Sequence, residues 1–81
     1  HKEAYDERKV YASIYASALN SQLDKVIAEK IAEKVSRAVT HWINSETQEV
    51  TSEEIFRKTI ELLKNEQKGV AFMYETHRDL A

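Results

Sequence analysis

The 81 residues of this chain are enough for one domain with a thin hydrophobic core. Twelve lysines and arginines against 14 aspartates and glutamates give a net charge of −2, which argues against a chain-wide surface for nucleic acid. The absence of cysteine excludes disulfides and cysteine-ligated zinc, and a single glycine excludes a glycine-rich phosphate loop.

The first helix is predicted from Asp6 to about Leu19. Asp6 is a good N-cap residue, and Glu7 suits the positive end of a helix. Alanines and serines between the apolar positions keep the helix surface small, which favours close packing. Residues 1–5 are mostly polar, with Tyr5 as the one bulky apolar side chain, and they are compatible with a short N-terminal strand. The apolar positions follow at helical spacing: Val10, Tyr11, Ile14, Tyr15, Ala18 and Leu19.

A second, longer helix is predicted to begin with a capping box formed by Ser21 and Asp24. Charged residues occupy its other side, and it ends in the polar loop of residues 44–49. Its apolar stripe is expected to be the buried face: Leu23, Val26, Ile27, Ile31, Val35, Val39, Trp42 and Ile43.

Thr51 and Glu54 form another capping box, which predicts the start of a third helix. Residues 65–69 are a polar turn that contains the only glycine, and a fourth helix follows. The third helix has its stripe at Ile55, Thr59, Leu62 and Leu63, with Phe56 and Ile60 beside it; the fourth carries Val70, Ala71, Met73, Tyr74, His77 and Arg78. The prediction is a mainly α, four-helix single domain over residues 1–81, because such helices can bury their stripes only against each other.

No catalytic centre is expected, since the sequence shows no serine nucleophile motif and no Ser/His/Asp set. His41 and His77 lack a ligand partner at i+4, so no metal site is predicted. Packing is favoured over base stacking for the tyrosines of the first helix. No helix has a one-sided basic face, which disfavours DNA binding. No apolar run reaches about 20 residues, so no membrane span is expected, and the lack of cysteine is compatible with a cytoplasmic location.

Three segments together resemble the ATP-cone domain, the small nucleotide-binding regulatory module of many ribonucleotide reductase large subunits, the reductase repressor family and some short stand-alone proteins. They are EAYDERKV at residues 3–10, VTSEEI at residues 50–55, and the closing stretch from Val70 to Arg78. The family's N-terminal hairpin, with its Lys-Arg-Asp-Gly sequence, has no counterpart here, and His77 replaces a usual aromatic residue.

The resemblance implies a nucleotide pocket between the first and last helices. Lys9 would pair with phosphate, while His77 or Arg78 would add positive charge. The resemblance assigns the remaining contacts to Glu3 and Asp6 on the ribose or adenine, to Val10 and Ile55 on the base, and to Thr51 at a helix N-terminus.

The function expected from this resemblance is non-catalytic regulation. Binding of ATP or dATP, with Mg²⁺ as a plausible addition, would change association of the domain with itself or with a partner protein. The alternative is a small helical dimerisation module without a nucleotide ligand, in which the Tyr/Ala/Ser first helix forms the interface.

Overall fold

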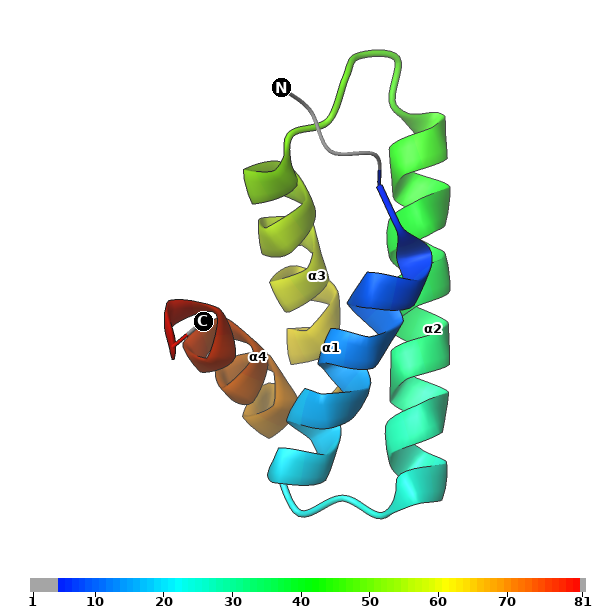
Figure 1. Cartoon of the computed structure of the whole chain (residues 1–81). Coiled ribbons are helices and arrows are strands. Elements are labelled where there is room, and N and C mark those ends of the chain that lie inside the picture. Colours follow the sequence, from blue (N-terminus) through cyan, green and yellow to red (C-terminus); the bar gives the residue numbers. More distant parts are fainter. Residues whose placement is uncertain (1–4, 81) are drawn as a thin grey trace.

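The computed structural model describes the backbone of residues 5–80 and the side chains of residues 5–77. Over that range the chain forms α1 (Glu7–Asn20), α2 (Lys25–Ser45), α3 (Ser52–Glu66) and α4 (Lys68–Leu80) (Figure 1). The predicted mainly α, four-helix architecture is confirmed, and residues 5–80 contain no strand. Residues 1–4 of the expected N-terminal strand lie outside the described residues, and Tyr5 is not in a strand.

Backbone hydrogen bonds cap the C-terminal end of α1. The N–H of Gln22 donates to the Leu19 carbonyl at 3.1 Å, and the N–H of Leu23 donates to the Ala18 carbonyl at 3.3 Å. This is the Schellman pattern, which needs a left-handed residue just after the helix. Gln22 supplies it with a φ of 71°. A side chain with a Cβ is strained in that conformation, so this turn stores a small amount of energy.

The predicted capping box at Ser21 is therefore wrong. Ser21 is the C-cap of α1 and not the start of α2. Asp24 alone caps α2, because its carboxylate accepts a hydrogen bond from the Ile27 N–H at 2.9 Å. The cap predicted at Asp6 is confirmed, since Asp6 accepts from the Arg8 N–H at 3.0 Å.

The capping box of α3 is confirmed in both directions. The Glu54 N–H donates to Thr51 Oγ1 at 3.1 Å, and the Thr51 N–H donates to Glu54 Oε1 at 2.9 Å. The polar turn after α3 is shorter than the predicted residues 65–69, since only Gln67 separates the two helices. Gly69 lies inside the first turn of α4. The chain changes direction sharply at this connection, which constrains the orientation of α4.

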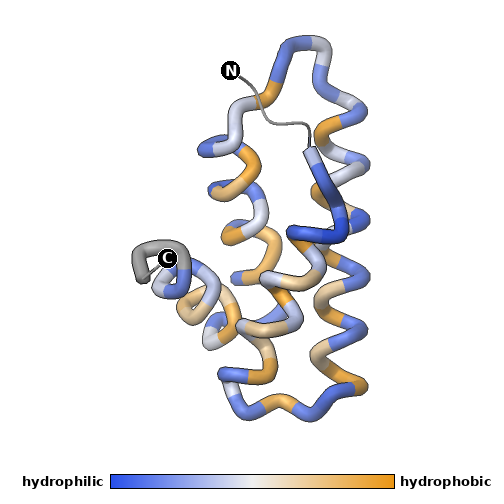
Figure 2. Tube along the Cα trace, in the orientation of Figure 1, coloured by the Kyte–Doolittle hydropathy of each residue, from blue (hydrophilic) through white to orange (hydrophobic). Residues whose placement is uncertain are grey.

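α1 packs against α2 and α4, and α3 also packs against α2 and α4. In Figure 1, α1, α2 and α3 run side by side, whereas α4 is inclined to them. Hydrophobic and hydrophilic residues alternate along the helices, as expected when one face of each is buried (Figure 2). All four helices contribute to the buried core, which comprises Ile14, Ala18, Ala28, Ile31, Ala32, Val35, Val39, Leu63, Val70 and Ala71.

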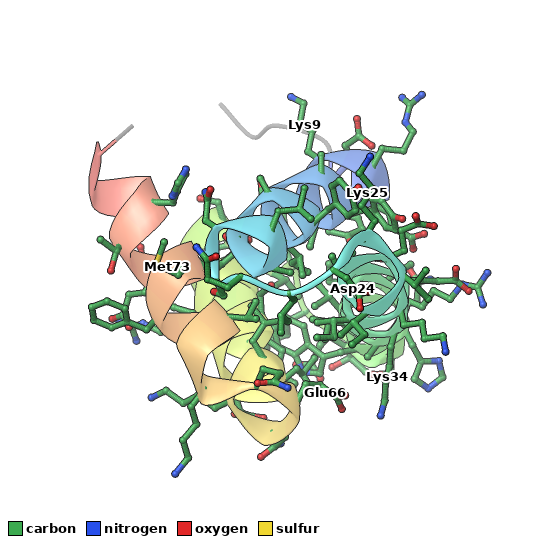
Figure 3. All side chains as sticks on the ribbon, turned by 90° about the horizontal axis from the view of Figure 1, so that it is seen from below. Lys9, Asp24, Lys25, Lys34, Glu66 and Met73 are labelled. Atoms are coloured by element: carbon green, nitrogen blue, oxygen red, sulfur yellow. The ribbon has the colours of Figure 1, made fainter. Side chains whose placement is uncertain are left out.

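The buried face of α2 differs in part from its predicted stripe. Val26 is 61% exposed and Ile27 is 41% exposed, whereas Ala28, Ala32 and Ser36 are buried. Hydropathy favours large apolar side chains, but close packing of two helices selects small ones at the contact. The face that meets the neighbouring helices therefore combines three residues of the predicted stripe, Ile31, Val35 and Val39, with the small residues beside them. An ion pair between Lys34 Nζ and Glu66 Oε2, 2.8 Å apart, joins α2 to α3 at the rim (Figure 3).

Candidate functional site

A groove of about 460 Å³ lies between α1 and α4. It exists because α1 presents small side chains where α4 inclines away from the other helices. Its lining is formed by Ala12, Ser13, Ala16 and Ser17 of α1, Phe56 of α3, and Tyr74 and His77 of α4. This volume falls within the usual range of small-molecule sites.

Two aromatic rings form one side of the groove. Phe56 and Tyr74 are stacked with their centroids 5.6 Å apart and their planes inclined by 24°. Both side chains are half-buried, so their positions are set by packing. The α1 residues of the lining, among them Ala16 and Ser17, are small. The arrangement suits a planar aromatic ligand, since aromatic rings stack favourably on one another.

The predicted base contacts do not line the groove. Val10 and Ile55 are half-buried and pack against the hydrophobic core. Among the predicted residues whose side chains are described, His77 is the one that the structure places in the groove wall. Its exposed imidazole lies one helical turn after Tyr74.

Lys9 lies on the same helix as the groove residues of α1 but outside the groove lining. It precedes Ala12 by three residues and Ser13 by four, so the three share one face of α1. Its side chain is exposed and extends away from the other helices (Figure 3). Lys9 is not part of the groove wall. To meet an anion bound in the groove, the Lys9 ammonium would have to fold back toward α4.

Two of the predicted contacts are already engaged in helix caps. The hydrogen bond from the Arg8 N–H holds the pKa of Asp6 below its usual value, and the hydrogen bond from the Thr51 N–H does the same for Glu54. Both carboxylates are thus held in the charged form. The contact expected from Thr51 used its hydroxyl and nearby N–H groups. The Thr51 hydroxyl already accepts the Glu54 N–H, and the Glu54 carboxylate occupies the N-terminus of α3, so a ligand would have to compete with this cap.

Glu3 and the side chain of Arg78 lie outside the described residues, although Arg78 itself belongs to α4. The aromatic pair and the small residues of α1 were not predicted as site residues. The signal for the small residues was present in the spacing of positions 12, 13, 16 and 17. Phe56 and Tyr74 could not be identified because their pairing depends on how α3 and α4 meet.

A polar network also joins the start of α1 to α2. The Tyr5 hydroxyl lies 2.8 Å from Thr40 Oγ1, and the Thr40 hydroxyl donates to the Glu7 carboxylate. Partial burial raises the pKa of Tyr5 above its usual value. The three residues hold the entry to α1 in place. This network is structural, because it lies within a packed helix contact.

Within residues 5–77, no three histidine, aspartate or glutamate side chains gather as a cluster that could hold a metal ion. Across the part of the chain that the structure describes, no helix combines the length and apolarity needed to cross a membrane. Comparisons with protein-family models, with curated proteins and with solved structures find no match for this chain.

Proposed function

We propose that this chain is a non-catalytic regulatory domain that binds ATP or dATP in the groove between α1 and α4. The observation that carries the proposal is the groove itself, which joins an aromatic wall to a wall of small residues. It lies between the first and last helices, where the resemblance to the ATP-cone domain implies a nucleotide pocket. A purine would stack beside Phe56 and Tyr74.

The phosphates of the nucleotide would be held by few protein charges. His77 lines the groove, and Lys9 precedes two groove residues, Ala12 and Ser13, by three and four positions on α1. Since residues 5–77 contain no metal-binding cluster, a Mg²⁺ ion bound with the nucleotide would be held mainly by phosphate oxygens and water. The protein's part is to place the phosphates, and the cation reduces their mutual repulsion.

Regulation would follow from the position of α4. A ligand between α1 and α4 favours whichever spacing of the two helices fits it better, so it shifts the domain between states. Phe72 on α4 is 66% exposed and provides apolar surface for a partner or a second copy. Movement of α4 would carry this side chain with it.

Isothermal titration with ATP and with dATP tests the proposal on the 81-residue chain and on a version with a Lys-Arg-Asp-Gly hairpin fused before His1. Lys9→Ala and Arg78→Ala should each weaken ATP binding by about 1.5–3 kcal/mol, roughly tenfold or more, through loss of a charged hydrogen bond. AMP should be affected less. Lys64→Ala is the matched control, because Lys64 is exposed in the last turn of α3 and has the same charge. If both variants bind ATP as the parent does, their assignment to the nucleotide pocket is wrong.

The second candidate is a dimerisation module without a ligand. It is favoured by the exposed small-residue face of α1, at Ala12, Ser13 and Ala16, which would allow another helix to approach closely. Tyr11 and Tyr15 do not add to this face, since they pack against the core. Sedimentation equilibrium of the parent and of Ala16→Glu separates the candidates: a parent dimer that the variant abolishes, with no heat from either nucleotide, supports dimerisation.

A further inference from the structure

The polar groups in the groove wall can pair with either purine. A site that distinguishes adenine from guanine places fixed donors or acceptors, such as amides, carboxylates or guanidinium groups, against the edge of the base. The described lining residues with a polar side chain are Ser13, Ser17, Tyr74 and His77. A hydroxyl group is both donor and acceptor and rotates to suit its partner, and a neutral imidazole carries one donor and one acceptor nitrogen. These groups therefore suit the amino group of adenine and the carbonyl oxygen of guanine equally.

The remaining polar atoms of the α1 wall are committed to the helix. Ser17 is 1% exposed, and its hydroxyl donates to the Ser13 carbonyl at 2.9 Å. The Ser17 carbonyl accepts a hydrogen bond from the Ser21 N–H at 3.1 Å. Residues 12–16 lie inside α1, where backbone N–H and carbonyl groups bond to each other. The backbone of this wall is therefore occupied and does not read the edge of a base.

The groove offers a base a surface for stacking. Phe56 and Tyr74 are stacked with their centroids 5.6 Å apart, and the methyl groups of Ala12 and Ala16 belong to the same lining. Stacking on an aromatic side chain tolerates any base, because every base has a π-face. A purine buries more ring area than a pyrimidine and gains more from this contact. Guanine exceeds adenine by a single non-hydrogen atom, which a groove of about 460 Å³ accommodates.

We infer that the groove binds purine nucleotides as a class, GTP as well as ATP, because it recognises the base by stacking and shape. The inference rests on the proposed function and widens its ligand from adenine nucleotides to purine nucleotides. It requires no particular orientation of the ligand along the groove, since aromatic and hydroxyl groups offer both purines the same contacts. A pocket without a base-specific hydrogen bond rejects a ligand of similar shape only weakly.

Isothermal titration of the 81-residue chain with ATP, GTP, CTP and UTP, at one pH and one Mg²⁺ concentration, tests the inference. ATP and GTP should bind within about fivefold of each other, which is the contribution of one net hydrogen bond. CTP and UTP should bind more than about fivefold more weakly than ATP, because a pyrimidine stacks over a smaller area.

Three substitutions each remove one polar group of the lining: Ser13→Ala, Tyr74→Phe and His77→Phe. Each should change the affinities for ATP and for GTP by the same factor, so their ratio stays within about fivefold. Tyr74→Leu removes a ring instead, and it should weaken both purine nucleotides and reduce their advantage over CTP. Tyr74 also packs against the core, whereas Ser13 and His77 are exposed, so the variants at these two positions keep the test valid if Tyr74→Leu does not fold.

A preference of the parent for ATP over GTP, or the reverse, by more than about fivefold would overturn the inference and leave the proposed function standing, because a base-specific contact would then exist. The same conclusion would follow if CTP bound within about fivefold of ATP, since the rings would then not select purines. Failure of all four nucleotides to bind, even to the chain with the fused hairpin, would overturn the proposed function and the inference with it.

Discussion

Both faces of α1 carry alanine and serine residues, but these small residues have opposite effects on the packing of the two faces. On the buried face, Ala18 is fully buried and brings neighbouring helices close. On the other face, Ala12, Ser13 and Ala16 border an open groove. Small residues thus give close packing where a partner helix runs alongside, and a cavity where the partner inclines away. The consequence of a small residue depends on what lies opposite it.

The largest effect is expected from the buried face. Ile14 is fully buried, so Ile14→Ala should destabilise the domain by about 2–5 kcal/mol through lost burial and the cavity left behind. Val26→Ala is the matched control, because Val26 is 61% exposed and should change stability by less than about 0.5 kcal/mol. Urea denaturation followed by circular dichroism measures both. Equal losses would show that the apolar stripe on α2 is buried in solution after all.

A smaller and more direct test enlarges one alanine on each face. Ala18→Leu should destabilise by about 1–3 kcal/mol, because no space is available around Ala18. Ala16→Leu should leave stability within about 0.5 kcal/mol, since Ala16 is exposed, while its larger side chain fills the groove and weakens nucleotide binding. Thermal unfolding and titration with ATP measure the two effects. A strong stability loss in Ala16→Leu would mean that the groove is closed in solution.

The aromatic wall of the groove depends on the start of α3. Thr51→Ala removes the acceptor for the Glu54 N–H and should cost about 0.5–2 kcal/mol. Because Phe56 follows within two turns, the groove should also loosen, and nucleotide affinity should fall with stability. Ser21→Ala is the comparison at the incorrectly predicted box: it removes the hydrogen bond from Ser21 Oγ to the Ser17 carbonyl at the end of α1, for about 0.5–1.5 kcal/mol, and no cap of α2. Chemical denaturation measures both variants, and an unchanged stability of Thr51→Ala would contradict the cap at Thr51.

The smallest expected effect is a gain in folding stability from a substitution at the C-terminal end of α1. Gln22→Gly should stabilise the domain by about 0.5–1 kcal/mol, because glycine adopts a φ of 71° without the steric cost of a Cβ. The melting temperature reports the change. Gln67→Gly provides the comparison, since Gln67 has a negative φ of −153° and should gain nothing. Destabilisation by Gln22→Gly would argue that the Schellman turn is not kept in solution.

The site shows where sequence reasoning stopped. Lys9 and His77 were assigned to one pocket because the resemblance implies it, whereas the structure has His77 in the groove wall and Lys9 outside the lining. The contacts of Val10 and Ile55 with the core depend on the rotation of α1 and α3, which periodicity defines only to within a neighbouring position. Thr51 was read correctly as a cap, and its role as a cap removes its N–H from the site.

By itself the sequence determined the number of helices, their order, and the caps at Asp6 and Thr51. These features depend on side chains within a few residues of each other, so local chemistry decides them. Only the tertiary structure decided which face of α2 is buried, and that Phe56 and Tyr74 stack to form one wall of a groove. The first depends on how α1 and α3 pack against α2. The second depends on the inclination of α4, which follows from the single residue between α3 and α4 and from the packing of Val70 and Ala71 in the shared core.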